Sequence, residues 1–364
     1  MKLDFLAPVY AHPGPVASVY LDTSRDVEDP DRAVELRWRH LRESLLAHDA
    51  DEATVGAVEE VLGAGRQIAG PHGQAVFAAR GQLVLAECLP EPPSRDAARF
   101  GSVPDALPLA LRHAPDIAYA AIAMHRAHPA EGSGTGDELE VAFDTGRWPM
   151  SRVAAVHRPD RRIPVDGWPR QAEELVDELT RFDEASALEA IVLAGDPWAA
   201  NTITRLAPKR LRDRLLKIKS DGPRHRESGR ALLEEELAEL FAGRRSDADR
   251  QQLDAFHAQR AREPHEVEGI TAAVAALQQG RAQALILSRP RLSDPNLWVG
   301  TAPTHLALSG AELNSFGVDY YWEEQAGNAL IRAAAATQAE LIVVHREELP
   351  LDDGVAVLLR YTST

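Results

Sequence analysis

The residues of this sequence best suited to bind a ligand are arginines and lysines that gather in two segments of its middle third. Residues 147–170 contain six arginines against two acids, and residues 205–230 contain ten lysines and arginines against three acids. Such clusters are typical of proteins that contact a polyanion, because guanidinium groups pair bidentately with phosphates. The alternative is a solvated surface on which these cations pair with neighbouring acids.

Motifs of the common enzyme classes are missing from the sequence. There is no P-loop, no H-E-x-x-H and no G-x-S-x-G. The glycine-rich run 132–136 precedes a predicted strand, which favours a hairpin turn over a phosphate loop. The pair Gly195-Asp196 follows a buried strand and predicts either a carboxylate at a sheet edge or a helix N-cap. With Cys88 as its single cysteine, the chain can form no intrachain disulfide and no cysteine zinc site, and we expect no metal and no cofactor.

The length and charge of the chain indicate its general class. A chain of 364 residues favours two or three domains, and we predict boundaries at 1–115, 116–265 and 266–364. The net charge of −16 argues against a simple nucleic-acid coat. No apolar run is long enough to span a bilayer, and the N-terminus has no apolar signal region. We therefore expect a cytoplasmic protein without a membrane partner.

The hydrophobic pattern predicts an α/β fold in every domain. In the first domain we expect strands at 16–21, 75–79, 83–87 and 107–111, helices at 31–48 and 51–68, and an irregular connection at 89–106. In the middle domain we expect strands at 117–124, 138–143, 152–156 and 190–194, a loop at 157–170, helices at 172–179 and 197–206, and a mostly helical segment at 224–262 with a break at Gly243. In the last domain we expect helices at 267–279 and 323–337 and strands at 284–287, 297–299, 341–344 and 355–359, forming a three-layer α/β sandwich.

Several stretches of the chain resemble the archaeal-type peptide-chain release factor and Pelota superfamily. The last domain, with Glu268-Gly269-Ile270 and the closing run 353–361, resembles the third domain of that superfamily. The strand 190–195 and the basic helices after it resemble the central domain. The run 16–22 is similar to the start of the bacterial members, a group that includes the ribosome hibernation factor Balon and its actinobacterial relatives. The resemblance covers nearly the whole chain.

This resemblance implies a three-part molecule that enters the ribosomal A site. The first domain would approach the decoding centre, the middle domain the peptidyl-transferase centre, and the third domain a translational GTPase or the stalk base. The implied partners are the 70S ribosome, through rRNA near both centres, and elongation factor Tu or another translational GTPase. The loop 157–171 matches the catalytic G-G-Q tip of release factors but contains no G-G-Q, so we predict a protein that is not an enzyme.

The loop 157–171 is instead suited to binding RNA. We expect its arginines to pair with phosphates and Trp168 to stack on an unpaired base. The alternative is an ordinary surface loop in which Trp168 is a helix staple. The predicted RNA-binding residues of the loop and of the second cluster are Arg158, Arg161, Arg162, Trp168, Arg170, Lys209, Arg210, Arg212, Arg214, Lys217 and Lys219.

These observations favour a non-catalytic ribosome-binding factor that acts in hibernation or stress. One alternative is a release or rescue factor that hydrolyses peptidyl-tRNA, with Gln171 or His157 in place of the missing glutamine. A second alternative is a protein-interaction module that acts on translational GTPases through its acidic outer domains.

Overall fold

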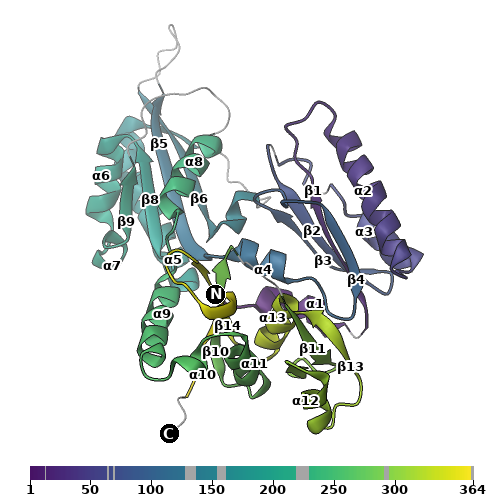
Figure 1. The fold of residues 1–364 in the computed structure, drawn as a ribbon. Helices are drawn as coiled ribbons and strands as arrows, with labels where there is room; N and C mark the ends of the chain where they lie inside the picture. Colours follow the sequence, from purple (N-terminus) through teal and green to yellow (C-terminus); the bar gives the residue numbers. More distant parts are fainter. Residues whose placement is uncertain are drawn as a thin grey trace. The chain divides into compact units, whose positions relative to one another are not determined.

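The chain forms two compact units, each a mixture of helices and sheets (Figure 1). The first unit consists of Met1–Ala114 together with Ala248–Thr364, and the second of Pro115–Asp247. The α/β fold class is confirmed, whereas the division into three domains stays a prediction. The computed structural model describes residues 1–12, 14–63, 65–68, 70–127, 137–153, 161–218, 229–290 and 295–361.

The first part of the first unit is an antiparallel sheet with the strand order β3-β2-β1-β4. Helix α2 carries Trp38, Leu41 and Leu45 on its buried side and packs with α3 against the sheet. Asp29 caps α2 by accepting a hydrogen bond from the Arg32 amide. The elements of this part are η1 (Asp4–Leu6), α1 (Ala7–Ala11), β1 (Val16–Asp22), α2 (Pro30–Ala47), α3 (Glu52–Glu59), β2 (Gly73–Ala79), β3 (Gln82–Leu89), β4 (Ala97–Gly101) and α4 (Leu107–His113).

Three predictions for this part were wrong. The helix expected at 51–68 is α3, which ends at Glu59. The connection 89–106 contains strand β4, which pairs with β1. The run 107–111 is the helix α4 and not a strand. Its Leu-Pro-Leu-Ala-Leu sequence alternates like a strand, but Pro108 fits the first turn of a helix and the buried Leu107 and Ala110 share one helical face.

The last part of the first unit contains two small sheets, with orders β14-β10-β15 and β12-β11-β13. Strands β10 and β14 are parallel, and α9, α11 and α13 contribute apolar residues to the same core. The predicted helix 323–337 begins only at Ala326, because 321–325 pairs with β11 as strand β13. The elements are α9 (Asp247–Arg260), α10 (Pro264–Val267), α11 (Ile270–Gln278), β10 (Ala282–Arg289), β11 (Asn296–Gly300), β12 (Leu306–Ala307), α12 (Gly310–Ser315), β13 (Tyr321–Gln325), α13 (Ala326–Ala336), β14 (Glu340–His345), η4 (Asp352–Gly354) and β15 (Val355–Leu359).

Polar contacts join the two parts of the first unit. Arg99 on β4 and Glu324 on β13 form an ion pair at 2.5 Å, and the Glu324 side chain is 2 % exposed. Asn328 on α13 donates to the Asp105 carboxylate at 2.9 Å and accepts from the Leu107 amide at 3.1 Å. These pairs lie beside a hydrophobic core to which both parts contribute. The first and last segments of the chain therefore form a single unit.

The second unit is built on a five-stranded sheet with the order β7-β6-β5-β8-β9. Strands β5, β8 and β9 are parallel, and β6 runs antiparallel to both β5 and β7. Helices α5 and α6 cover one face, and α8 contributes Leu237 and Phe241 to the other. The elements are β5 (Ile117–Ala127), β6 (Glu138–Trp148), η2 (Met150–Val153), β7 (Arg161–Pro164), η3 (Val165–Gly167), α5 (Trp168–Ser186), β8 (Ala190–Gly195), α6 (Pro197–Leu206), α7 (Lys209–Arg212), β9 (Leu215–Ile218) and α8 (Gly229–Phe241).

Two predictions for the second unit also need correction. The predicted strand 152–156 begins in a 3-10 helix, η2, and its later residues lie outside the described part of the chain. The predicted loop 157–170 contains strand β7, and α5 begins at Trp168 rather than near Ala172. The loop was expected because 157–170 shows no periodicity and contains three prolines, but four residues suffice to pair β7 with the edge of β6.

Trp168 holds α5 against the rest of the second unit. Its side chain is 0 % exposed and belongs to the core formed by the sheet, α5 and α6. Its ring nitrogen donates to the Ala199 carbonyl in the first turn of α6 at 3.4 Å. The packing of both helices therefore depends on this ring.

We predict that Trp168→Ala destabilises the second unit by about 3–5 kcal/mol, because removing a fully buried tryptophan leaves a cavity. Urea unfolding followed by circular dichroism measures the change. Trp198→Ala is the matched control, since Trp198 is 41 % exposed, and it should cost about 1 kcal/mol or less. Equal losses for the two variants would contradict the core position of Trp168.

We also predict that Glu324→Gln weakens the first unit by about 1–3 kcal/mol, because Arg99 then loses its charged partner in a partly buried site. Glu323→Gln changes the neighbouring, exposed carboxylate by the same chemistry and should stay within about 0.5 kcal/mol of the parent protein. Thermal and urea unfolding of the three proteins provide the comparison. If both substitutions prove equally mild, the ion pair does not hold the first unit together.

Candidate nucleic-acid interface

The carboxyl ends of the parallel strands β5, β8 and β9 define one edge of the second unit's sheet, here called the carboxyl edge. Strand β8 ends there at Gly195, which has φ of +96°. A Cβ atom on Gly195 would lie 2.0 Å from the Met124 carbonyl oxygen, so no side chain fits at this position. The next residue, Asp196, donates its amide to the same oxygen at 2.7 Å. Glycine therefore allows β5 and β8 to end side by side.

Asp196 connects this edge to helix α6 and to strand β5. One carboxylate oxygen accepts from the Ala199 amide at 2.8 Å, which confirms the predicted helix N-cap. The other accepts from the Arg126 guanidinium at 2.7 Å. Burial raises the pKa of Asp196, but the hydrogen bonds from Ala199 and Arg126 outweigh it and hold the pKa below its usual value. Asp196 is thus a charged structural residue of the edge.

Arg126 and Trp198 were missed by the sequence analysis. The Arg126 guanidinium lies 5.7 Å from the centre of the Trp198 ring, a cation–π contact. The hydrogen bond with Asp196 raises the pKa of Arg126. The predicted strand stopped at Met124, whereas β5 continues to Ala127 and so carries Arg126 to the edge. Strand alternation beyond the apolar run was the signal that could have found it.

Three of the predicted loop arginines lie at or near the carboxyl edge. Arg161 and Arg162 belong to β7, whose last residue, Pro164, pairs with Glu138 at the same end of the sheet as Ala127. Ile163, which follows them, is buried, whereas the two arginines are exposed. Arg170 lies in the first turn of α5.

The acids near these arginines hold them only weakly. Arg162 lies 3.9 Å from Glu140 and its side chain is 69 % exposed, and Arg170 lies 3.7 Å from Glu174 and is 88 % exposed. Exposed ion pairs of this kind contribute little free energy, about 0–1 kcal/mol. Arg161, Arg162 and Arg170, which we call the edge arginines, can therefore turn to an external anion at low cost.

The structure contradicts the predicted role of Trp168. A side chain that is 0 % exposed offers no face to a nucleic-acid base. Its apolar surface and ring nitrogen are both used within the second unit. Trp168 is thus a core residue at the start of α5, which is closer to the alternative of a helix staple.

The second basic cluster lies mostly at the opposite edge of the sheet. Helix α7 precedes β9, which starts beside Ile191 near the beginning of β8. There Arg214 and Arg210 pair with the buried Asp183 at 2.6 and 3.6 Å. Asp183 also accepts from the Leu188 amide at 3.1 Å. Arg210 and Arg214 therefore stabilise the turn between α5 and β8 by their contacts with Asp183.

The remaining residues of this cluster have different surroundings. Arg212 donates to the Ala207 carbonyl at 2.9 Å, and Lys209 is exposed at the start of α7. Lys217 lies near the carboxyl edge and donates to the Asn201 side chain at 2.8 Å. The structure thus brings Lys217 close to the edge, while 209–214 lie away from it. Arg158, Lys219 and the glycine-rich run 132–136 lie outside the described residues.

Among the described residues, no histidine, cysteine, aspartate and glutamate side chains gather in a group of three that could hold a metal ion. Gln171, a candidate for hydrolysis, donates to the Glu174 carboxylate at 2.9 Å, and His157 lies outside the described part.

Within the part that the structure describes, no helix is long and apolar enough to cross a membrane.

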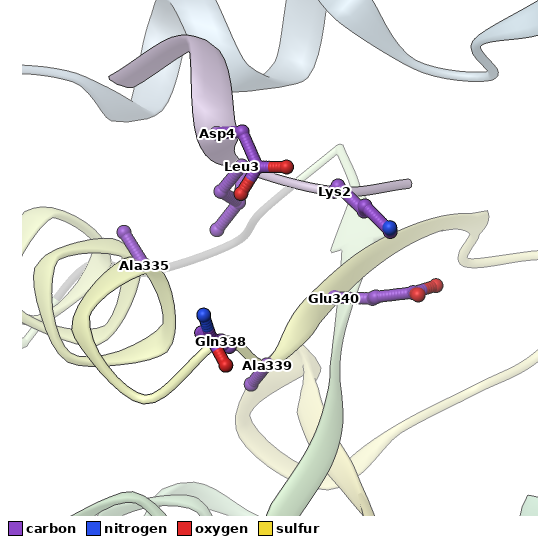
Figure 2. A pocket seen from close by; sticks show the side chains of 7 residues that line it. All are labelled: Lys2, Leu3, Asp4, Ala335, Gln338, Ala339 and Glu340. Atoms are coloured by element: carbon purple, nitrogen blue, oxygen red, sulfur yellow. The ribbon is translucent and has the colours of Figure 1, made fainter. Parts of the chain in front are cut away.

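A pocket of about 250 Å³ lies in the first unit, where the first residues of the chain meet the turn between α13 and β14 (Figure 2). Lys2, Asp4, Gln338 and Glu340 supply its polar lining. Figure 2 shows these side chains spread around the opening rather than converging on one point. The pocket therefore lacks the convergent polar groups of a small-molecule site.

A family model of known proteins matches much of the second unit. Residues 119–262 match the model described as "Bacterial archaeo-eukaryotic release factor family 2". Two similar relatives, both uncharacterized proteins of Mycobacterium tuberculosis, are MT2704 of strain CDC 1551 and Rv2629 of strain H37Rv. Each is 27% identical over 386 residues, covering 100% of this chain and 98% of the relative.

Solved structures that are similar to the chain include two of Pelota. Archaeal Pelota, in a model of ribosome-bound Pelota and ABCE1, is 10% identical over 100% of this chain and 95% of its own, with a TM-score of 0.39. Archaeoglobus fulgidus Pelota is 11% identical over 80% of each chain, with a TM-score of 0.34. The family match covers residues 119–262, a segment that includes most of β5 and the strands β6 to β9 of the second unit.

Proposed function

We propose that this protein is a ribosome-associated translation factor that binds rRNA through the carboxyl edge of its second unit. The observation that carries the proposal is the set of exposed edge arginines, which lie within the segment that matches a release factor family. Arginine is suited to such a contact because its planar guanidinium pairs bidentately with phosphate. Since the adjoining acids hold these side chains only weakly, little interaction is lost when RNA replaces them.

The finer proposal is a factor of the Balon type that occupies the A site of the 70S ribosome in hibernation or stress, with elongation factor Tu or another translational GTPase as a second partner. No Gly-Gly-Gln occurs anywhere in the 364 residues, which supports binding without hydrolysis. The side chain of Gln171 is engaged with Glu174, which also supports this reading.

We predict that replacing the edge arginines by glutamine (Arg161→Gln, Arg162→Gln, Arg170→Gln) weakens ribosome binding about 10–100-fold at moderate salt. Each lost phosphate contact should also lower the slope of log K against log salt by about one. Co-sedimentation with purified 70S ribosomes over a salt series measures both effects.

The matched control for this experiment removes three exposed arginines of helix α2 (Arg32→Gln, Arg39→Gln, Arg42→Gln) and makes the same change in net charge. It should leave the salt slope nearly unchanged. The proposed function is wrong if the parent protein fails to pellet with ribosomes at low salt. The proposed surface is wrong if the edge variant and the α2 variant behave alike.

We further predict that the protein releases no labelled peptide from stalled ribosomes above the level of buffer, because it lacks the glutamine that would orient the attacking water. Gln171→Ala should therefore change neither this background nor ribosome binding. Peptide release that requires Gln171 would instead establish the alternative of a hydrolysing release or rescue factor.

A further inference from the structure

Strands β11, β12 and β13 and helix α12 form a part of the first unit, here called the aromatic lobe, that carries exposed acids and exposed aromatic rings. From Pro295 to Ile331 the chain contains no lysine and no arginine, whereas the whole chain has 40 in 364 residues. The same stretch contains four acids. Glu324 is paired with Arg99 inside the unit, but Asp319 and Glu323 are exposed. The segment thus has no lysine or arginine of its own, and Arg332 of α13, which contacts the lobe, is partly buried and donates to the Gly300 carbonyl.

Large aromatic side chains accompany these carboxylates. Phe316 is 62 % and Tyr320 72 % exposed, and both lie in the connection between α12 and β13. The Tyr320 ring lies 5.7 Å from the ring of Trp322 on the adjoining strand. Exposed phenylalanine and tyrosine on a folded surface are typical of protein–protein interfaces, where aromatic residues are enriched.

The backbone around these rings is well supported. Val318, between Phe316 and Tyr320, is 8 % exposed and packs with Leu313 and Ala307 in a small core of the lobe. Asn314 donates to the Tyr321 hydroxyl at 2.9 Å. The connection between α12 and β13 is therefore anchored by the packing of Val318 and by the hydrogen bond from Asn314 to Tyr321.

We propose that the aromatic lobe is a docking surface for a protein segment that carries arginine or lysine beside apolar residues. Charge complementarity selects this partner, because Asp319 and Glu323 attract cations and repel the phosphates of RNA. The rings of Phe316 and Tyr320 can accept a guanidinium over their faces and cover apolar side chains beside it. The inference goes beyond the proposed function and does not rest on it, since it concerns another unit and a partner of opposite charge.

The probe for this proposal is a fluorescein-labelled peptide of alternating arginine and leucine, and its binding is followed by fluorescence anisotropy. The full-length protein should bind it, and the same peptide with glutamate in place of arginine should not bind. Replacing both rings (Phe316→Ala, Tyr320→Ala) should weaken binding at least about tenfold, as is typical of aromatic residues at the centre of an interface. Replacing both carboxylates (Asp319→Asn, Glu323→Gln) should weaken it at low salt, and this difference should disappear near about 1 M salt.

The matched control removes an exposed leucine and an exposed acid from helix α2 (Leu36→Ala, Glu43→Gln) and should bind the peptide like the parent protein. The proposal is overturned if the control weakens binding as much as the lobe variants. It is also overturned if a labelled rRNA fragment binds through the lobe, or if sedimentation reveals a dimer that only the lobe variants abolish. A failure of ribosome binding with intact, lobe-dependent peptide binding would count against the proposed function alone.

Discussion

The carboxyl edge of the second unit depends on one close approach, that of Gly195 to the Met124 carbonyl. Because no Cβ atom fits there, β5 and β8 can end side by side, and Asp196 can accept the hydrogen bonds of both Ala199 and Arg126. These contacts hold the start of α6. The ring of Trp168 reaches the same turn of α6 from α5. A backbone contact therefore fixes the ends of β5 and β8, and the edge arginines of β7 and α5 lie at the same edge of the sheet.

In this acidic chain, exposed positive and negative charges gather on different surfaces. The exposed cations at the carboxyl edge suit a polyanion, whereas the lysine- and arginine-free aromatic lobe suits a basic protein segment. Cations that could have enlarged the first surface are used internally, as with Arg210 and Arg214 on Asp183. A cluster of basic residues in the sequence thus contains cations that pair with buried acids and cations that are exposed to solvent. Only the contacts of each side chain in the folded protein distinguish the two kinds.

Much of the fold was predictable because its strands are apolar and β-branched. The runs 117–124 and 190–194 pair as β5 and β8, and their continuous apolar pattern reflects helices on both faces of the sheet. The errors fall where local pattern and tertiary pairing disagree. Leu107–Leu111 alternates like a strand but is helical, and residues 323–325 were expected in a helix but pair with β11. Short segments of this kind are decided by their neighbours and not by their own propensity.

The sequence alone determined the α/β class and the presence of two cationic segments, because composition and periodicity are local properties. Only the tertiary structure decided that Trp168 is core, that residues 209–214 lie at the edge opposite to the edge arginines, and that Glu324 pairs with Arg99 across 225 residues. The physical reason is that exposure and ion pairing depend on which distant segments pack together. Residue type and spacing limit those contacts but do not select them.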